Sequence, residues 1–104
     1  MAAYLIADVV EMTDPAGFQE YTRRVARTVE QYGGKYLVRG GTAKKAEGIW
    51  DPGRVVVIEF ETMEHLEKWY HSKEYNGPMK LRQQSASTNV LFVEGVSGKV
   101  SDKG

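Results

Sequence analysis

The feature that most constrains the fold is a nearly unbroken apolar run, Arg54-Val55-Val56-Val57-Ile58-Glu59-Phe60. A strand with one exposed face alternates polar and apolar residues, whereas a strand covered on both faces is continuously apolar. The run therefore predicts a strand that is buried on both faces, with Glu59 as its interior charge. Residues 4–10 have the same character, with Asp8 as the interior charge.

The first helix is predicted between two clear end signals. Asp14 and Pro15 provide an N-cap and a first-turn proline, and Gly33-Gly34 permits a left-handed C-cap. Between them, one apolar stripe recurs at helical spacings of three, four, four and three. Its members are Phe18, Tyr21, Val25, Val29 and Tyr32.

The region after residue 60 is predicted to contain two helical pieces. Thr62 and Ser72 are each placed to cap a helix N-terminus. Asn76-Gly77-Pro78 predicts a further irregularity in the second piece. Leu66, Trp69 and Tyr70 share one helix face, which favours core packing for Trp69 over a role in a ligand cavity.

Two further strands are predicted at 35–39 and 89–94, and a long connection spans Gly40 to Gly53. Loops of this length in small domains are often functional. Asp51-Pro52-Gly53-Arg54 closes the connection, with Pro and Gly placed as in a type II turn. The polar, glycine-containing residues 97–104 are predicted to form a flexible C-terminal tail.

This order of elements, β-α-β-β-α-β, predicts an α+β fold. It is the order of the ferredoxin-like unit, an antiparallel sheet with both helices on one face, here spanning residues 1–96. The first and third strands lie centrally in that topology, and they are the two without polar alternation. Because the helices cover only one face, we expect a second copy to cover the other and form a dimeric α/β barrel.

Composition excludes several classes of function. Fourteen basic and fourteen acidic residues give a formal net charge of zero, which argues against nucleic acid because phosphate binding needs a basic surface. The absence of cysteine excludes disulfides, thiolate nucleophiles and cysteine metal sites. No signal peptide or membrane-spanning run is visible, so we expect a cytoplasmic protein without a membrane partner. His65 and His71 lie on different sides of one helix, so they predict no metal site.

Several segments resemble motifs of the domain-of-unknown-function 1330 family, in the same order along the chain. They are residues 36–41, 47–50, 54–60, 69–75 and 93–95, together with Arg82. One departure is Lys73, which stands where the family has proline. The resemblance implies a ferredoxin-like homodimer of the dimeric α/β-barrel superfamily. It implies no particular activity, since that superfamily holds cofactor-free monooxygenases, haem-degrading enzymes, lactone isomerases and stress-related proteins.

Charged residues inside the strands mark the candidate site. Burying such groups is costly unless they are paired. Glu59 is the predicted catalytic base, with Asp8 as the alternative, in a pocket between the sheet and the helices. By alternation along the strand, Glu59 shares a sheet face with Val55 and Val57, and Arg54 lies on the opposite face. The predicted substrate-binding residues are Arg39, Arg54, Arg82, Trp50, Tyr75 and Glu47. The arginines would hold an anion in bidentate fashion, and the aromatic residues would wall the cavity.

The sequence leaves two interpretations of these residues open. In the first, a dimer binds a small anionic or carbonyl-bearing organic molecule without a cofactor, and either only binds it or transforms it by acid–base or cofactor-free oxidative chemistry. In the second, the same charges form a structural ion-pair network in a non-catalytic binding or stress-response dimer. Haem binding through His71 is a minor alternative that rests on superfamily analogy alone.

Overall fold

The computed structural model describes residues 1–96, so the predicted flexible tail at 97–104 lies outside the described residues. Its elements are β1 (Ala3–Met12), α1 (Pro15–Gln31), β2 (Lys35–Arg39), β3 (Arg54–Phe60), α2 (Met63–Tyr70), α3 (Lys73–Ser85) and β4 (Ala86–Glu94). The predicted order of elements is confirmed, with the second helical region divided in two.

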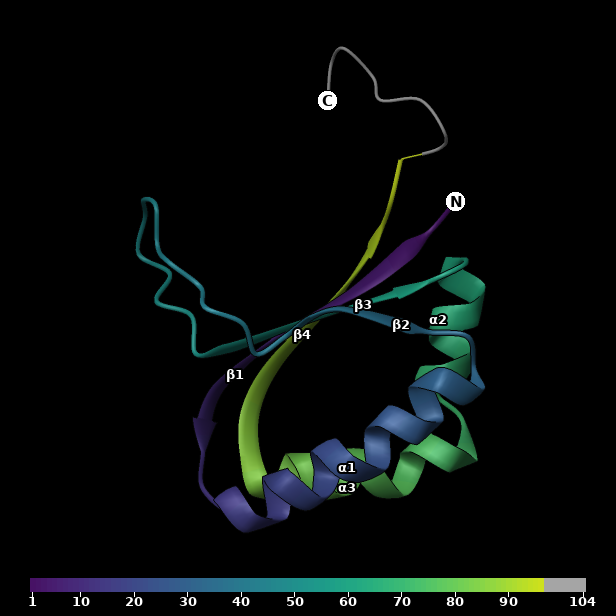
Figure 1. Ribbon diagram of the computed structural model, residues 1–104, viewed down its shortest axis with the longest axis horizontal. Helices are drawn as coiled ribbons and strands as arrows, with labels where there is room; N and C mark the ends of the chain where they lie inside the picture. Colours follow the sequence, from purple (N-terminus) through teal and green to yellow (C-terminus); the bar gives the residue numbers. More distant parts are fainter. Residues whose placement is uncertain (97–104) are drawn as a thin grey trace.

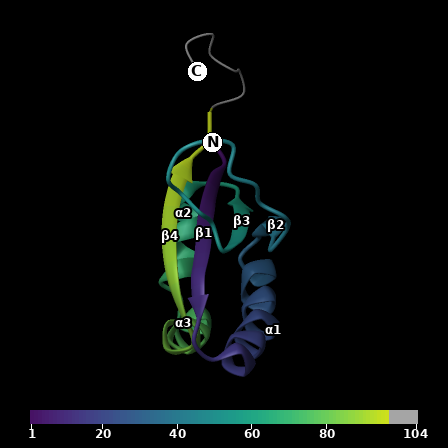
Figure 2. The same cartoon turned by 90° about the vertical axis from the view of Figure 1, so that its left-hand side faces the viewer.

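The four strands form one antiparallel sheet in the order β2-β3-β1-β4. Figure 2 shows the strands side by side, and Figure 1 shows the helices on one side of them. The two strands without polar alternation, β1 and β3, are the central pair, as predicted. This is the ferredoxin-like α+β arrangement.

The predicted helix ends are confirmed by their hydrogen bonds. The side chains of Asp14, Thr62 and Ser72 each accept from the backbone N–H three residues on. At the end of α1, Gly33 has a φ of +78°. The N–H groups of Gly33 and Gly34 donate to Glu30 and Val29 at 3.0 and 2.8 Å, which is the Schellman pattern.

The core lies between the sheet and the helices, and aromatic rings occupy its centre. Phe60, Trp69 and Tyr75 are each 1% exposed. The Trp69 ring lies 4.2 Å from the Tyr75 ring and 5.4 Å from the Phe60 ring, centroid to centroid. The Trp69 indole N–H donates to the buried Thr28 hydroxyl at 2.9 Å. The prediction that Trp69 packs in the core is confirmed, and the same side chain also lines the pocket described below.

Three local predictions were wrong or incomplete. Gly53 does not have a positive φ, so Asp51–Arg54 is not a type II turn. Position 53 requires glycine for a steric reason, because a Cβ on Gly53 would lie 2.1 Å from the Val9 carbonyl oxygen. Pro78 does not interrupt α3, which continues through it. The last strand begins at Ala86, three residues earlier than predicted.

The sheet face away from the helices is partly open in the single chain. On this face Ile6 lies between its cross-strand neighbours Val57 and Leu91. Leu91 is 57% exposed. The 40–53 loop extends away from the helices (Figure 1).

Within residues 1–96, no helix has the length and apolar character needed to cross a membrane. The cytoplasmic location stays a prediction.

Candidate functional site

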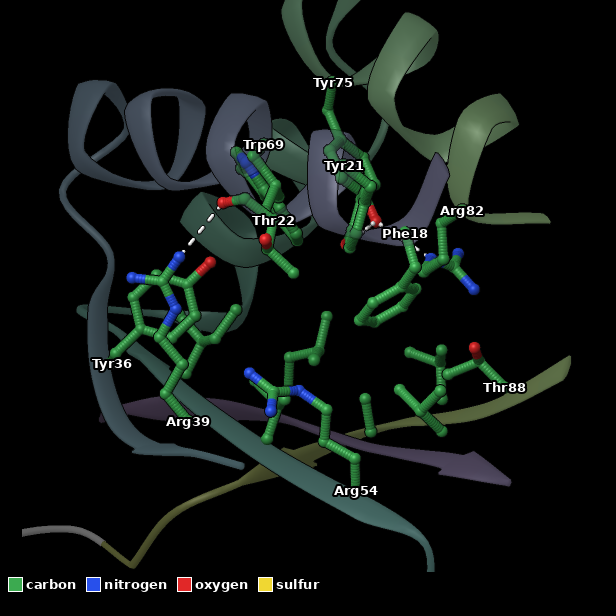
Figure 3. Close-up of a pocket in the computed structure, with 17 residues that line it drawn as sticks. Phe18, Tyr21, Thr22, Tyr36, Arg39, Arg54, Trp69, Tyr75, Arg82 and Thr88 are labelled. Atoms are coloured by element: carbon green, nitrogen blue, oxygen red, sulfur yellow. Dashed lines mark hydrogen bonds between the residues drawn. The ribbon is translucent and has the colours of Figure 1, made fainter. Parts of the chain in front are cut away.

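A pocket lies between the sheet and helices α1 and α3, with mainly apolar walls (Figure 3). Its volume is about 40 Å³, which is space for about two or three water molecules. The pocket therefore accepts a small group, with access from its open side for the rest of a ligand. The lining residues are Leu5, Ala7, Val9, Phe18, Tyr21, Thr22, Val25, Tyr36, Arg39, Arg54, Val56, Ile58, Trp69, Tyr75, Arg82, Thr88 and Val90.

Three arginines from three different elements line this pocket: Arg39 at the end of β2, Arg54 at the start of β3, and Arg82 in α3. Arg82 is 7% exposed, Arg54 is half-buried and Arg39 is exposed at the edge. No carboxylate among residues 1–96 lines the pocket. The ion pairs of the described chain, Arg23–Glu20 and Lys45–Asp51, lie elsewhere. The pocket therefore has an excess of positive charge.

Arg54 carries the clearest unsatisfied group in the pocket. Its Nε is buried and has no hydrogen-bond partner among the described residues. Figure 3 shows its guanidinium directed into the open centre of the pocket. The Thr88 hydroxyl on β4 is likewise buried without a partner there. Buried polar groups in native proteins are almost always hydrogen-bonded, so these two atoms are available to a ligand or a bound water.

Gly40 makes room for the Arg54 guanidinium. A Cβ on Gly40 would lie 2.2 Å from Arg54 Nη1, and Gly40 has a φ of +75°. The Gly40 N–H also donates to the Val55 carbonyl oxygen at 2.9 Å. Gly40 thus ends β2 and at the same time shapes the site, because only a glycine leaves this space open.

Arg39 is held at the edge of the pocket by two contacts. Its Nη2 donates to the backbone carbonyl oxygen of Thr22 at 3.0 Å, across to α1. Its guanidinium carbon lies 4.6 Å from the centre of the Tyr36 ring, a distance at which cation–π attraction acts. Arg39 therefore connects β2 to α1 beside the entrance.

Opposite the strands, two phenols and a guanidinium form a hydrogen-bonded chain. The hydroxyl oxygens of Tyr21 and Tyr75 are 3.0 Å apart, and Arg82 Nε donates to the Tyr75 hydroxyl at 3.4 Å. Burial, followed by the neighbouring Tyr75, raises the pKa of Tyr21 well above its ordinary value. Burial also raises the pKa of Tyr36. Tyr21 and Tyr36 are therefore protonated near neutral pH and can donate hydrogen bonds.

The structure brings four of the predicted site residues to the pocket: Arg39, Arg54, Arg82 and Tyr75. It does not bring Glu59, Trp50 or Glu47 there. The roles of all seven in binding or catalysis stay predictions.

The residues that lie outside the pocket have other surroundings. Glu59 is on the opposite sheet face, where it pairs across strands with Tyr4 and raises the pKa of that phenol through a hydrogen bond. The Trp50 indole donates to the buried Asp8 carboxylate at 2.8 Å, and the Gly53 N–H donates to its other oxygen at 2.8 Å. Glu47 is exposed in the 40–53 loop. Asp8 thus ties the loop to the sheet, outside the pocket.

Sequence reasoning missed Tyr21, Tyr36 and Thr88 as lining residues. Tyr21 belongs to the apolar stripe of α1, and its hydroxyl is the one feature that distinguishes it from a core residue. Tyr36 shares a sheet face with Ile58, its cross-strand partner. Alternation along β2 and β3 would have placed it beside Arg54 once the pairing of these strands was known.

Comparisons with known proteins agree with this fold. Residues 2–96 match the family model described as Domain of unknown function (DUF1330). No curated protein matches the chain. Solved structures with similar folds include a protein of unknown function from Rhodopseudomonas palustris, with a TM-score of 0.71 and 15% identity over 92% of this chain and 83% of that one.

Two further structures are described by family or activity. An ethyl tert-butyl ether d (ethd) family protein from Bacillus halodurans c-125 has a TM-score of 0.61 and 17% identity, over 92% of this chain and 100% of that one. A protein described as an antibiotic biosynthesis monooxygenase has a TM-score of 0.55 and 14% identity, over 92% of this chain and 99% of that one. At these identities the similarity shows the fold alone.

Proposed function

The chain belongs to the DUF1330 family of domains of unknown function, and from its pocket we propose that it binds small organic anions. The observation that carries the proposal is the half-buried Arg54, whose Nε lacks a partner among the described residues in a pocket lined by no described carboxylate. A buried cation without a partner is costly. A carboxylate would offset that cost, because it fits a guanidinium through two parallel hydrogen bonds.

The walls of the pocket favour an apolar body on this anion. Apart from the arginines, phenols and threonines, the lining side chains are aliphatic or aromatic. The volume of about 40 Å³ fits a carboxylate group, and the carbon chain can continue toward the open side. We therefore propose a short aliphatic carboxylate, rather than an inorganic anion, as the ligand class. Burying its methylene groups adds about 0.8 kcal/mol each.

Fluorescence of Trp69 tests the proposal, because Trp69 lines the pocket and the other tryptophan, Trp50, does not. In a Trp50→Phe background, acetate, propionate and pentanoate are titrated against the neutral amide of pentanoate. We expect saturable binding of the acids that tightens with chain length, and no binding of the amide. Loss of one charge-assisted contact in Arg54→Met should weaken pentanoate binding about tenfold or more.

The matched control is Arg27→Met, at an exposed arginine on α1 that does not line the pocket. Its affinity for pentanoate should equal that of the parent protein. Equal binding of acid and amide, or equal effects of the Arg54 and Arg27 variants, would refute anion binding at this pocket.

We further propose that the protein is a homodimer through the open face of its sheet. The support is the apolar character of that face, which includes Ile6, Val57 and Leu91, together with the zero net charge of the chain, which lowers repulsion between copies. Two such sheets pack about 10 Å apart when they stack face to face. Residues on this face, including Glu59, would then lie at the interface and not at the ligand.

A further inference from the structure

The hydrogen-bonded chain of Tyr21, Tyr75 and Arg82 contains one hydroxyl hydrogen that has no acceptor among the described residues. A guanidinium only donates, so Arg82 Nε must donate to the Tyr75 oxygen. The two tyrosines have two hydroxyl hydrogens, and their mutual contact at 3.0 Å uses one of them. Neither hydroxyl has another partner among the described residues. Whichever phenol donates to the other, one hydroxyl hydrogen remains without an acceptor.

This chain lies in the wall of the pocket, where its unused hydrogen is accessible to a ligand. All three side chains line the pocket. Tyr75 and Arg82 are 1% and 7% exposed and Tyr21 is half-buried, so bulk water has limited access to the chain. Arg82 has no carboxylate partner among residues 1–96. Its charge therefore polarises the Tyr75 hydroxyl to which it donates.

The pocket consequently has two polar regions of different chemistry. Arg54 enters from β3, whereas Tyr21, Tyr75 and Arg82 come from the helices on the other side (Figure 3). Apolar residues of the sheet, including Val56 and Val90, line the space with them. A carboxylate bound to Arg54 would leave the spare phenolic hydrogen available for a second oxygen on the same molecule.

We propose that the ligand is a short keto acid, whose carboxylate contacts Arg54 and whose carbonyl oxygen accepts the spare hydrogen of the Tyr21–Tyr75 pair. This inference rests on the proposed anion binding and adds the second functional group of the ligand. The neutral donor, backed by the charge of Arg82, polarises the carbonyl. A hydroxyl donor in a site of low polarity is the type of group that stabilises developing negative charge on such an oxygen.

The test compares pentanoate with 2-oxopentanoate and 4-oxopentanoate, which have the same chain length and differ in the carbonyl. We expect at least one oxo acid to bind about five- to tenfold more tightly than pentanoate, the gain typical of one hydrogen bond. The double variant Tyr21→Phe/Tyr75→Phe should lose this preference, so that the oxo acid and pentanoate bind to it with equal affinity. Tyr32→Phe, at a phenol that donates to Glu74 outside the pocket, is the matched control and should retain it.

An infrared measurement on the parent protein keeps the inference testable if the double variant does not fold. The carbonyl of the preferred oxo acid, labelled with ¹³C, should absorb at lower frequency when bound than when free, and Arg82→Met should reduce the shift. A bound carbonyl at its free frequency, or a preference that persists in the folded double variant, would overturn the keto-acid inference. Absence of pentanoate binding would instead overturn the anion proposal, and the keto-acid inference with it.

Discussion

At the residue scale, the Arg54 guanidinium occupies space that only glycine leaves open at position 40, directly after the neighbouring strand β2. Gly40 has a φ of +75°, and a Cβ placed on it would lie 2.2 Å from Arg54 Nη1. Either feature alone would favour glycine, and together they exclude any side chain without movement of Arg54. The position of Arg54 in the pocket therefore depends on a residue that does not itself line the pocket.

Gly40→Ala should affect both stability and binding. The strained backbone should cost about 1–2 kcal/mol of unfolding free energy, and displacement of Arg54 should weaken pentanoate binding about tenfold. Urea denaturation and Trp69 fluorescence measure the two effects. Gly41→Ala is the control, because its φ is not positive and its Cβ would meet only Val38, at 3.9 Å. If both variants bind pentanoate equally well, Gly40 does not position Arg54.

At the element scale, a single threonine links α1 to α2. The Thr28 hydroxyl accepts from the Trp69 indole at 2.9 Å and donates to the Val25 carbonyl oxygen at 2.8 Å. The side chains of Thr28 and Trp69 are both buried. The contact fixes the orientation of Trp69, and thereby one wall of the pocket, from a helix 41 residues away in sequence.

Thr28→Val keeps the shape of this side chain and removes its hydroxyl. The Trp69 N–H would then be buried without an acceptor, so the unfolding free energy should fall by about 1–3 kcal/mol. Thr22→Val on the same helix removes a hydroxyl that donates to the Gln19 carbonyl oxygen at 2.8 Å and has no tryptophan partner. Its effect should stay within about 0.5 kcal/mol. Similar losses in the two variants would argue against the link between the helices.

At the scale of the whole molecule, the sheet has one face covered by helices and one face that no helix covers. The covered face holds the aromatic core and the pocket. On the open face, Leu91 and Val93 are 57% and 38% exposed. An antiparallel sheet can leave one face to water, but that face is then normally polar.

Leu91→Glu should therefore prevent dimer formation without unfolding the chain. We expect light scattering to give the mass of a dimer for the parent protein and of a monomer for Leu91→Glu, with the same circular dichroism spectrum. Gln84→Glu, which adds the same charge at an exposed position of α3, should remain a dimer. A monomeric parent protein, or a dimeric Leu91→Glu variant, would rule out this interface.

The sequence by itself determined the elements and their order. Helix caps at Asp14, Thr62 and Ser72 and the glycine stop after α1 are local interactions, formed within a few residues of one another, so their signals stand in the sequence. The order of elements also predicted that β1 and β3 lie centrally, since the first and third strands are central in the ferredoxin-like topology, and the apolar runs of both strands agree with it. Alternation separated Arg54 from Glu59 without showing which face the pocket would use.

Only the tertiary structure decided which residues meet in the pocket. The Tyr21–Tyr75 contact joins positions 54 residues apart, and Trp50 meets Asp8 across 42 residues. No periodicity encodes such pairs, because they depend on strand order, register and the path of the 40–53 loop. Alternation along β3 places Glu59 on the sheet face away from the helices, and the path of the 40–53 loop takes Trp50 to Asp8. The packing of α1 over the sheet brings Tyr21 into the pocket.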